Sequence, residues 1–220
     1  MKTISVRKNV LAENDLIAAN LRERFSKNKI FVINIISSPG SGKTTLLERT
    51  ITALKDKLNI QIIVGDVQTE NDADRLRKSG GKAVQIQTNG ACHLDARMIQ
   101  KILDGMELDG PGLLIIENVG NLVCPASYDL GEDVKVVILS APEGDDKPLK
   151  YPAVFHRAGL MIITKTDMLE LCNFDPQAAY RNAAQINPSI KCIKLSSKTG
   201  EGMQSWFEWL KNNVVKKISP

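Results

Sequence analysis

Short apolar runs alternate with segments whose apolar residues recur at helical spacing along most of this chain. The apolar runs have the length and composition of buried strands, and they lie at residues 30–36, 60–64, 83–87, 112–117, 134–139, 160–163 and 190–195. Amphipathic patterns predict helices over residues 10–27, 44–57, 71–79, 94–104, 175–186 and 202–216. The alternation indicates an α/β fold: a mostly parallel sheet of about seven strands with helices on both faces and an amino-terminal helix.

The domain organisation follows from length and continuity. The chain has 220 residues, and no internal repeat, low-complexity tract or Pro-rich linker interrupts it. We therefore expect a single domain over residues 1–220, with an amino-terminal helical extension at 1–28. The longest expected loop, at about 140–153, is rich in proline and charge, which is typical of a functional loop. Right-handed crossovers place the loops that follow the strands along one edge of the sheet, where ligands bind.

The first strand runs directly into the sequence S-S-P-G-S-G-K-T-T at positions 37–45. A strand that enters a Gly-rich loop, followed by a Lys-Thr pair that opens a helix, is the P-loop of nucleoside triphosphatases. The glycines let several N–H groups point at one phosphate, the lysine adds a mobile charge, and the threonine can ligate Mg²⁺. The usual first glycine of the motif is here Ser37. The predicted phosphate-binding residues are Pro39, Gly40, Ser41, Gly42, Lys43, Thr44 and Thr45.

Two acidic residues end other predicted strands. Glu117 is followed three positions later by Gly120, which fits a Mg²⁺-sensing switch whose glycine N–H meets the γ-phosphate, with Glu in place of the commoner Asp. Asp66 ends the strand at 60–64, and a carboxylate near phosphates needs a cation beside it. We predict that Thr44, Asp66 and Glu117 hold Mg²⁺. The residues predicted to serve catalysis are Lys43, Asp66 and Glu117.

Two later segments indicate which base is bound. Residues 164–167 read Thr-Lys-Thr-Asp, which resembles the guanine-reading Asn-Lys-x-Asp motif with Thr for Asn. The Asp167 carboxylate can accept two N–H groups that guanine offers and adenine does not, and the Lys165 stem can lie along the base. The loop Ser196-Ser197-Lys198 resembles one that offers a backbone N–H to the guanine oxygen. In this order after a P-loop, these segments favour GTP over ATP.

A second group of chemically active residues consists of Cys92, His93 and Cys124. The first two stand where a helix is expected to begin, and the helix dipole would stabilise a thiolate there. Two thiols and an imidazole from two loops can bind Zn²⁺ or Ni²⁺ as an incomplete site. Alternatively, the two cysteines are buried apolar residues and the histidine is a capping group. Cys172 and Cys192 have no such neighbours in sequence and are expected to serve packing.

Composition limits the kinds of partner and the cellular location that we expect for this protein. The net charge of +4, from 29 basic and 25 acidic residues, is compatible with a phosphate-bearing ligand and lacks the clustering of a nucleic-acid footprint. No apolar run approaches the ~20 residues that span a bilayer, and residues 1–8 do not resemble a signal peptide. We therefore expect a cytoplasmic protein with reduced thiols and neither a membrane nor a nucleic-acid partner.

Five segments together resemble the HypB family of hydrogenase nickel-incorporation GTPases. They read S-S-P-G-S-G-K-T-T-L-L-E, G-D-V-Q-T-E-N-D-A-D-R, C-H-L-D-A, I-E-N-V-G-N-L-V-C-P and E-G-D-D-K-P-L-K-Y-P. The resemblance implies a P-loop fold and a Mg²⁺-dependent GTPase that converts GTP and water to GDP and phosphate and forms a homodimer around nucleotide. It further implies delivery of nickel to the large subunit of [NiFe]-hydrogenase with a partner metallochaperone.

The resemblance also assigns roles to residues. It implies that Cys92, His93 and Cys124 bind Zn²⁺ or Ni²⁺ at the dimer interface, and that Lys147 contacts nucleotide across it. Three other functions stay open: a urease-type nickel GTPase, although its Cys-Pro-His block is absent from the sequence; a P-loop small-molecule kinase; and a non-catalytic scaffold that stores metal. Hydrolysis is expected to be slow, because no catalytic glutamine or arginine finger is identifiable.

Overall fold

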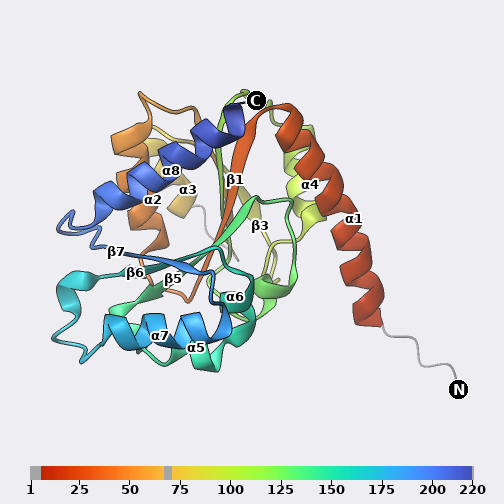
Figure 1. Ribbon diagram of the computed structural model, residues 1–220. Coiled ribbons are helices and arrows are strands. Elements are labelled where there is room, and N and C mark those ends of the chain that lie inside the picture. Colours follow the sequence, from red (N-terminus) through yellow and green to blue (C-terminus); the bar gives the residue numbers. More distant parts are fainter. Residues whose placement is uncertain (1–5, 67–70, 220) are drawn as a thin grey trace, which may run out of the picture.

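The computed structural model describes residues 6–66 and 71–219, and within them seven strands form one sheet (Figure 1). The strand order is β3-β2-β4-β1-β5-β6-β7, and every paired neighbour is parallel. The α/β fold expected from the apolar runs is thereby confirmed. The strands are β1 (Ile30–Ser37), β2 (Ile60–Asp66), β3 (Lys82–Gln87), β4 (Gly112–Glu117), β5 (Val134–Ser140), β6 (Leu160–Thr164) and β7 (Lys191–Lys194).

All six predicted helices are present, and their ends differ by a few residues from the expected ones, as helix ends commonly do. They are α1 (Val6–Lys27), α2 (Lys43–Leu54), α3 (Asn71–Lys78), α4 (Ala96–Asp104), α7 (Pro176–Ile186) and α8 (Met203–Ile218).

The prediction of one long loop at 140–153 is wrong. This segment folds into η2 (Ala141–Glu143), α5 (Lys147–Lys150) and the start of α6 (Pro152–Arg157). Proline at the first or second position of each element presets the helical φ angle, so here proline starts helices that composition alone reads as loop. A capping box between Ser140 and Glu143 adds to this effect. Two further short helices are η1 (Cys124–Ser127) and η3 (Thr166–Met168).

The core consists of two apolar layers, one on each face of the sheet. Along β1, Phe31 and Ile33 pack toward α2, α3 and α8, whereas Ile30 and Val32 pack toward α1 and α4. Both faces are apolar, which is why the strands read as continuous apolar runs. The short helices α5 and α6, together with α7, cover the remainder of the second face (Figure 1).

Helix α1 lies along α4 in Figure 1 and contributes Ala18, Leu21 and Phe25 to the core. Arg22 on this helix donates two hydrogen bonds, of 2.7 and 2.8 Å, to the carboxylate of Asp129. The helix is therefore packed against the sheet unit. The division of the chain into one domain and an extension at 1–28 stays a prediction.

The parallel arrangement brings the carboxyl ends of the strands to one edge. Strand β1 lies between β4 and β5, so the chain leaves it at the point where the strand order reverses, which is where such sheets bind ligands. Among the residues that the structure describes, no helix combines the length and the apolar character that crossing a membrane requires.

Candidate nucleotide and metal sites

A cavity of about 610 Å³ opens where β1, β2 and β4 end. Its size suits a nucleotide. Gly40 and Gly42 have φ angles of 72° and 92°, and a Cβ at either position would meet no atom within 4 Å. Their backbone thus borders open space that a phosphate can fill. The predicted residues that line the cavity are Pro39, Gly40, Gly42, Lys43, Thr44, Thr45, Asp66, Glu117, Gly120 and Lys165.

Helix α2 begins at Lys43, directly beside this cavity. Its N-cap residue is Gly42, which has no side chain to occupy the first N–H groups of the helix. Free N–H groups and the positive end of the helix dipole together favour an anion at this position.

Lys43 is held by a residue that departs from the usual motif. Its Nζ donates a hydrogen bond of 2.9 Å to Ser37 Oγ, and burial lowers the pKa of Lys43. A glycine at position 37 would offer no such partner. Ser37 therefore supplies a resting acceptor for the ammonium group, a role that the sequence pattern did not suggest.

Glu117 is buried at the end of β4, and one of its two oxygens is satisfied. The Thr44 hydroxyl donates to Glu117 Oε1 at 3.0 Å, whereas Oε2 has no hydrogen-bond partner in the described part of the chain. Burial raises the pKa of Glu117 from its ordinary 4.5 to about 7. A buried carboxylate oxygen without a partner, beside a threonine hydroxyl and Asp66, fits the oxygen ligands that Mg²⁺ prefers.

The raised pKa of Glu117 predicts how the nucleotide-free protein responds to pH. The folded state binds this proton more tightly than the unfolded state, so the contribution of Glu117 to stability falls as pH rises from about 4.5 to about 7 and is constant above that. Glu117→Gln has no such proton to lose. We expect it to exceed the wild type in unfolding free energy by about 3 kcal/mol at pH 8, with the difference disappearing near pH 4.5.

Urea unfolding of both proteins between pH 4.5 and 8 measures this difference. Glu201→Gln, at an exposed position, is the matched control and should follow the wild type at every pH. A Glu117→Gln protein that is no more stable than the wild type at pH 8 would show that the native carboxylate is not destabilised by burial.

The predicted base-recognition residues are tied to the P-loop. Thr164 Oγ1 donates to Ser41 O and Lys165 Nζ donates to Gly40 O, both at 2.8 Å. Asp167 Oδ1 accepts a hydrogen bond of 2.6 Å from Ser196 Oγ, and this bond is the main reason that the pKa of Asp167 is lowered. The carboxylate is thus ionised and held by Ser196, although neither residue lines the phosphate cavity itself.

The loop that carries Ser197 and Lys198 is held by an arginine that sequence reasoning missed. Arg49 on α2 donates to the carbonyl oxygens of Ser197 and Lys198, at 3.1 and 3.4 Å. The backbone of this loop is therefore positioned relative to the helix that begins at the phosphate site. No sequence pattern around Arg49 predicts this contact.

The structure brings Cys92, His93 and Cys124 together. Their ligand atoms lie within 4.8 Å of one another, and Cys92 Sγ lies 3.7 Å from His93 Nδ1. Zinc and nickel bind thiolates and imidazole at roughly 2.0–2.3 Å, so a small closure of these side chains suffices to hold one ion. The alternative in which the two cysteines are buried apolar residues is wrong, because Cys92 is exposed and Cys124 is half-buried.

The expectation that a helix dipole stabilises the Cys92 thiolate is also wrong. Helix α4 begins at Ala96, and its N-cap is Asp95, whose carboxylate accepts from Met98 N at 2.8 Å. The side-chain hydrogen bond with Cys124 raises the pKa of Cys92, because it favours the protonated thiol. Metal binding at this pair therefore releases protons.

His93 has a supporting contact that its position in the sequence does not reveal. Its ring stacks on Tyr128, with centroids 4.0 Å apart and planes at 29°. Burial lowers the pKa of His93, which favours the neutral imidazole that metals bind. Tyr128 thus fixes the orientation of the ring of a candidate metal ligand.

Three predicted or noted residues lie away from this arrangement. Lys147 begins α5 outside the cavity lining, with its Nζ 5.1 Å from the centre of the Tyr151 ring. Cys172 and Cys192 pack against the core, as expected, and burial raises the pKa of Cys192 to about 11. Residues 67–70 of the G-D-V-Q-T-E segment, and residues 1–5 at the amino terminus, lie outside the described residues.

Known proteins resemble this chain along most of its length. A family profile described as "CobW/HypB/UreG, nucleotide-binding domain" matches residues 31–194. The chain is 47% identical over 216 residues to the hydrogenase maturation factor HypB of Rhizobium leguminosarum bv. viciae, covering 98% of this chain and 72% of that protein. It is 44% identical to the hydrogenase/urease maturation factor HypB of Helicobacter pylori (strain ATCC 700392 / 26695), covering 95% of this chain and 87% of that protein.

A crystal structure of HypB from Helicobacter pylori in complex with nickel superimposes with a TM-score of 0.89 and 43% identity. The alignment covers 94% of this chain and 98% of that one. The fold described above is therefore shared along nearly the whole of both chains.

Proposed function

The chain belongs to the HypB family of hydrogenase maturation factors, and on that premise we propose that it is a GTPase whose nucleotide state controls the delivery of nickel. One observation carries the proposal. The segment from Glu117 to Cys124 begins at the cavity for the triphosphate and ends at the Cys-His-Cys cluster. Within it, Asn121 Nδ2 donates to Cys92 O at 3.1 Å, so the two ligand loops contact each other.

The nucleotide half of the proposal assigns a task to each group. Lys43 and the N–H groups at the start of α2 bind the phosphates, and Thr44, Asp66 and Glu117 hold Mg²⁺, which supplies charge neutralisation when bound. Asp167 selects guanine. Gly120 offers its N–H to the γ-phosphate.

Hydrolysis converts GTP and water to GDP and phosphate. Asp66 ends β2 and lines the cavity, and we assign its carboxylate to orient the attacking water. Arg75 also lines the cavity, but its guanidinium group already forms an ion pair with Glu48 at 2.7 Å. Slow turnover is the expected result, and release of phosphate over many turnovers separates this enzyme from a metal-storing scaffold.

The metal half of the proposal treats nickel as cargo. Cys92, His93 and Cys124 supply three ligands, and the fourth comes from water or from a second copy of the chain. Zn²⁺ suits the same ligand set. We propose that GTP draws two subunits together with this face between them, and that Lys147 then reaches the nucleotide of the other subunit.

The partners are inferred from membership of the family. We propose that a metallochaperone loads or receives the ion and that the large subunit of [NiFe]-hydrogenase is the final acceptor, in the cytoplasm. Urease maturation is a second candidate, because one relative carries both assignments in its name. A small-molecule kinase is less compatible with Asp167, because adenine would leave its charge without the N–H partners that guanine provides.

The test measures Ni²⁺ affinity with and without a non-hydrolysable GTP analogue in the presence of Mg²⁺. Coupled sites typically change each other's affinity by about 5- to 150-fold, and we expect at least tenfold here. The matching ATP analogue is the control and should leave the Ni²⁺ affinity unchanged. Equal Ni²⁺ affinity with and without the GTP analogue would sink the proposal, and sedimentation in the same samples records the dimer.

A further inference from the structure

Asn118 lies between the phosphate cavity and the loop that carries Cys92 and His93, here called the ligand loop. It directly follows Glu117, and only 1% of its surface is exposed. Its Oδ1 accepts hydrogen bonds from the backbone N–H groups of Val119, at 3.0 Å, and of Leu94, at 3.2 Å. Leu94 directly follows His93 in the chain, so a single carboxamide bonds both the turn after β4 and the loop of the metal cluster.

The turn that carries Asn118 is packed closely against the P-loop. A Cβ on Gly120 would lie 3.0 Å from Pro39 Cγ. The turn after β4 is therefore in close contact with Pro39 of the P-loop.

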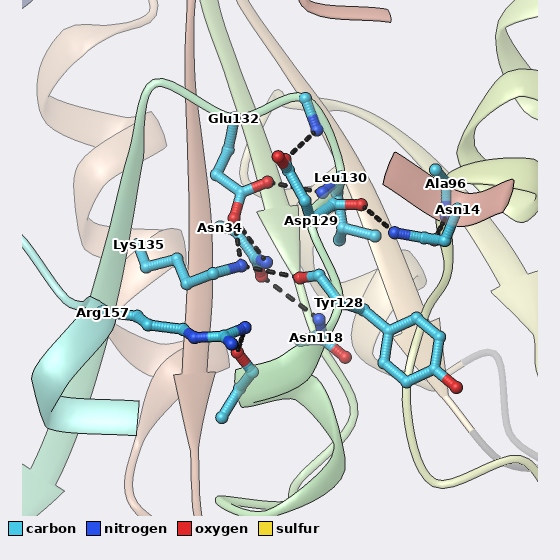
Figure 2. Close-up of polar contacts among 12 residues, drawn as sticks. Asn14, Asn34, Ala96, Asn118, Tyr128, Asp129, Leu130, Glu132, Lys135 and Arg157 are labelled. Carbon is cyan, nitrogen blue, oxygen red and sulfur yellow. Dashed lines mark hydrogen bonds and ion pairs between the residues drawn. The ribbon is translucent and has the colours of Figure 1, made fainter. Parts of the chain in front are cut away.

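The carboxamide is also fixed from the opposite side, as Figure 2 shows. Asn118 Nδ2 donates to Asn34 Oδ1 at 3.2 Å, and this bond forces Oδ1 to face Leu94 and Val119. Asn34 Nδ2 in turn donates to the buried Glu132 Oε1 at 3.5 Å. The orientation of the Asn118 amide is thus determined by its neighbours.

The same network continues to the aromatic support of His93. Glu132 forms a buried ion pair with Lys135, whose Nζ donates to Tyr128 O at 2.7 Å (Figure 2). The Tyr128 ring stacks on His93. Two routes therefore run from the strand ends to the ligand loop: a short one through Asn118 and a longer one through Glu132 and Tyr128.

We propose that Asn118 is the positioning residue that transmits nucleotide state to Cys92 and His93. This inference rests on the proposed function and identifies the residue that connects the nucleotide site to the metal site. When the turn after Glu117 shifts, the Asn118–Leu94 bond pulls the ligand loop with it. Asn121 also reaches that loop, but its bond to Cys92 O is exposed to water, which can replace it, whereas a broken bond at buried Asn118 leaves Leu94 N–H without a partner.

The test measures the ratio of the Ni²⁺ affinity with the GTP analogue to the Ni²⁺ affinity without it. It uses two Asn118 variants and one control variant. Asn118→Ala removes the bond, and Asn118→Ser keeps a local polar group that is too short to reach Leu94. For both we expect the ratio to fall from at least about tenfold to within about twofold of unity. A purely structural role would alter stability without altering this ratio.

Asn14→Ala is the matched control. Asn14 is a buried asparagine whose Oδ1 accepts from Ala96 N at 2.8 Å, two residues beyond Leu94, and it bonds no residue of the phosphate cavity. It should keep the wild-type ratio. The inference is overturned if Asn14→Ala loses the ratio as well, or if the Asn118 variants retain it.

A second measurement needs no variant. Adding the GTP analogue to the wild type should change the hydrogen-exchange rate of the Leu94 amide, and an unchanged rate overturns the inference. Absence of any nucleotide effect on Ni²⁺ affinity in the wild type would instead count against the proposed function itself, so the two failures are distinguishable.

Discussion

Asp167→Asn is expected to lower the affinity for GTP by about 1,000-fold, because two charge-assisted hydrogen bonds to the base are lost or reversed. The carboxylate is already ionised and held by Ser196, so it is prepared to accept two N–H groups from guanine. Xanthine carries an oxygen where guanine carries its amino group. An asparagine can donate to that oxygen, so the variant should prefer xanthosine triphosphate.

Fluorescent-nucleotide titration with GTP, ATP and xanthosine triphosphate measures this change. Asp56→Asn, at an exposed position before β2 and so at the other end of the sheet, is the matched control and should bind GTP as the wild type does. If Asp167→Asn still prefers GTP over xanthosine triphosphate, Asp167 is not the base-reading group.

Cys124→Ala is expected to weaken Ni²⁺ binding by at least about 100-fold. Loss of a residue that only supports a ligand typically lowers metal affinity by 10- to 100-fold, and loss of a direct thiolate ligand lowers it further. Cys124 is the only one of the three grouped residues on the segment that leads from Glu117, so the variant should also lose the effect of GTP on the remaining ligands.

Competition with a chelating dye measures Ni²⁺ affinity in this variant. Cys172→Ala is the control, because Cys172 is equally half-buried yet packs against the core. Its Ni²⁺ affinity should equal that of the wild type.

Because contact with Cys124 raises the pKa of Cys92, Cys124→Ala should also make the Cys92 thiol react faster with an alkylating reagent at pH 8. An unchanged rate would mean that the two thiols are not in contact in solution.

The inner strands were predictable because they are buried on both faces, which leaves a continuous apolar run in the sequence. The edge strands β3 and β7 are partly exposed. The P-loop was predictable because its glycines, lysine and threonine are consecutive in the chain. The helices near residue 150 were not, because Pro148 and Pro152 start helices there, and composition cannot separate that use of proline from a turn.

The sequence revealed the metal cluster only in part. It gave Cys92, His93 and Cys124 as candidates, but their supports come from distant positions. Tyr128 meets His93, and Asn118 meets Leu94, only after the chain has folded. Single tyrosines and asparagines carry no local signal of such contacts, and one sequence offers no means of choosing among them.

Two side chains that line the phosphate cavity are hydrogen-bonded within the chain. Ser37 accepts from Lys43 and Glu117 accepts from Thr44, so the two side chains that should meet Mg·GTP already have partners. Binding of Mg·GTP therefore has to exchange these two internal hydrogen bonds for contacts to the ligand. The free energy gained at Lys43 and Thr44 is then the difference between the new contacts and the old ones.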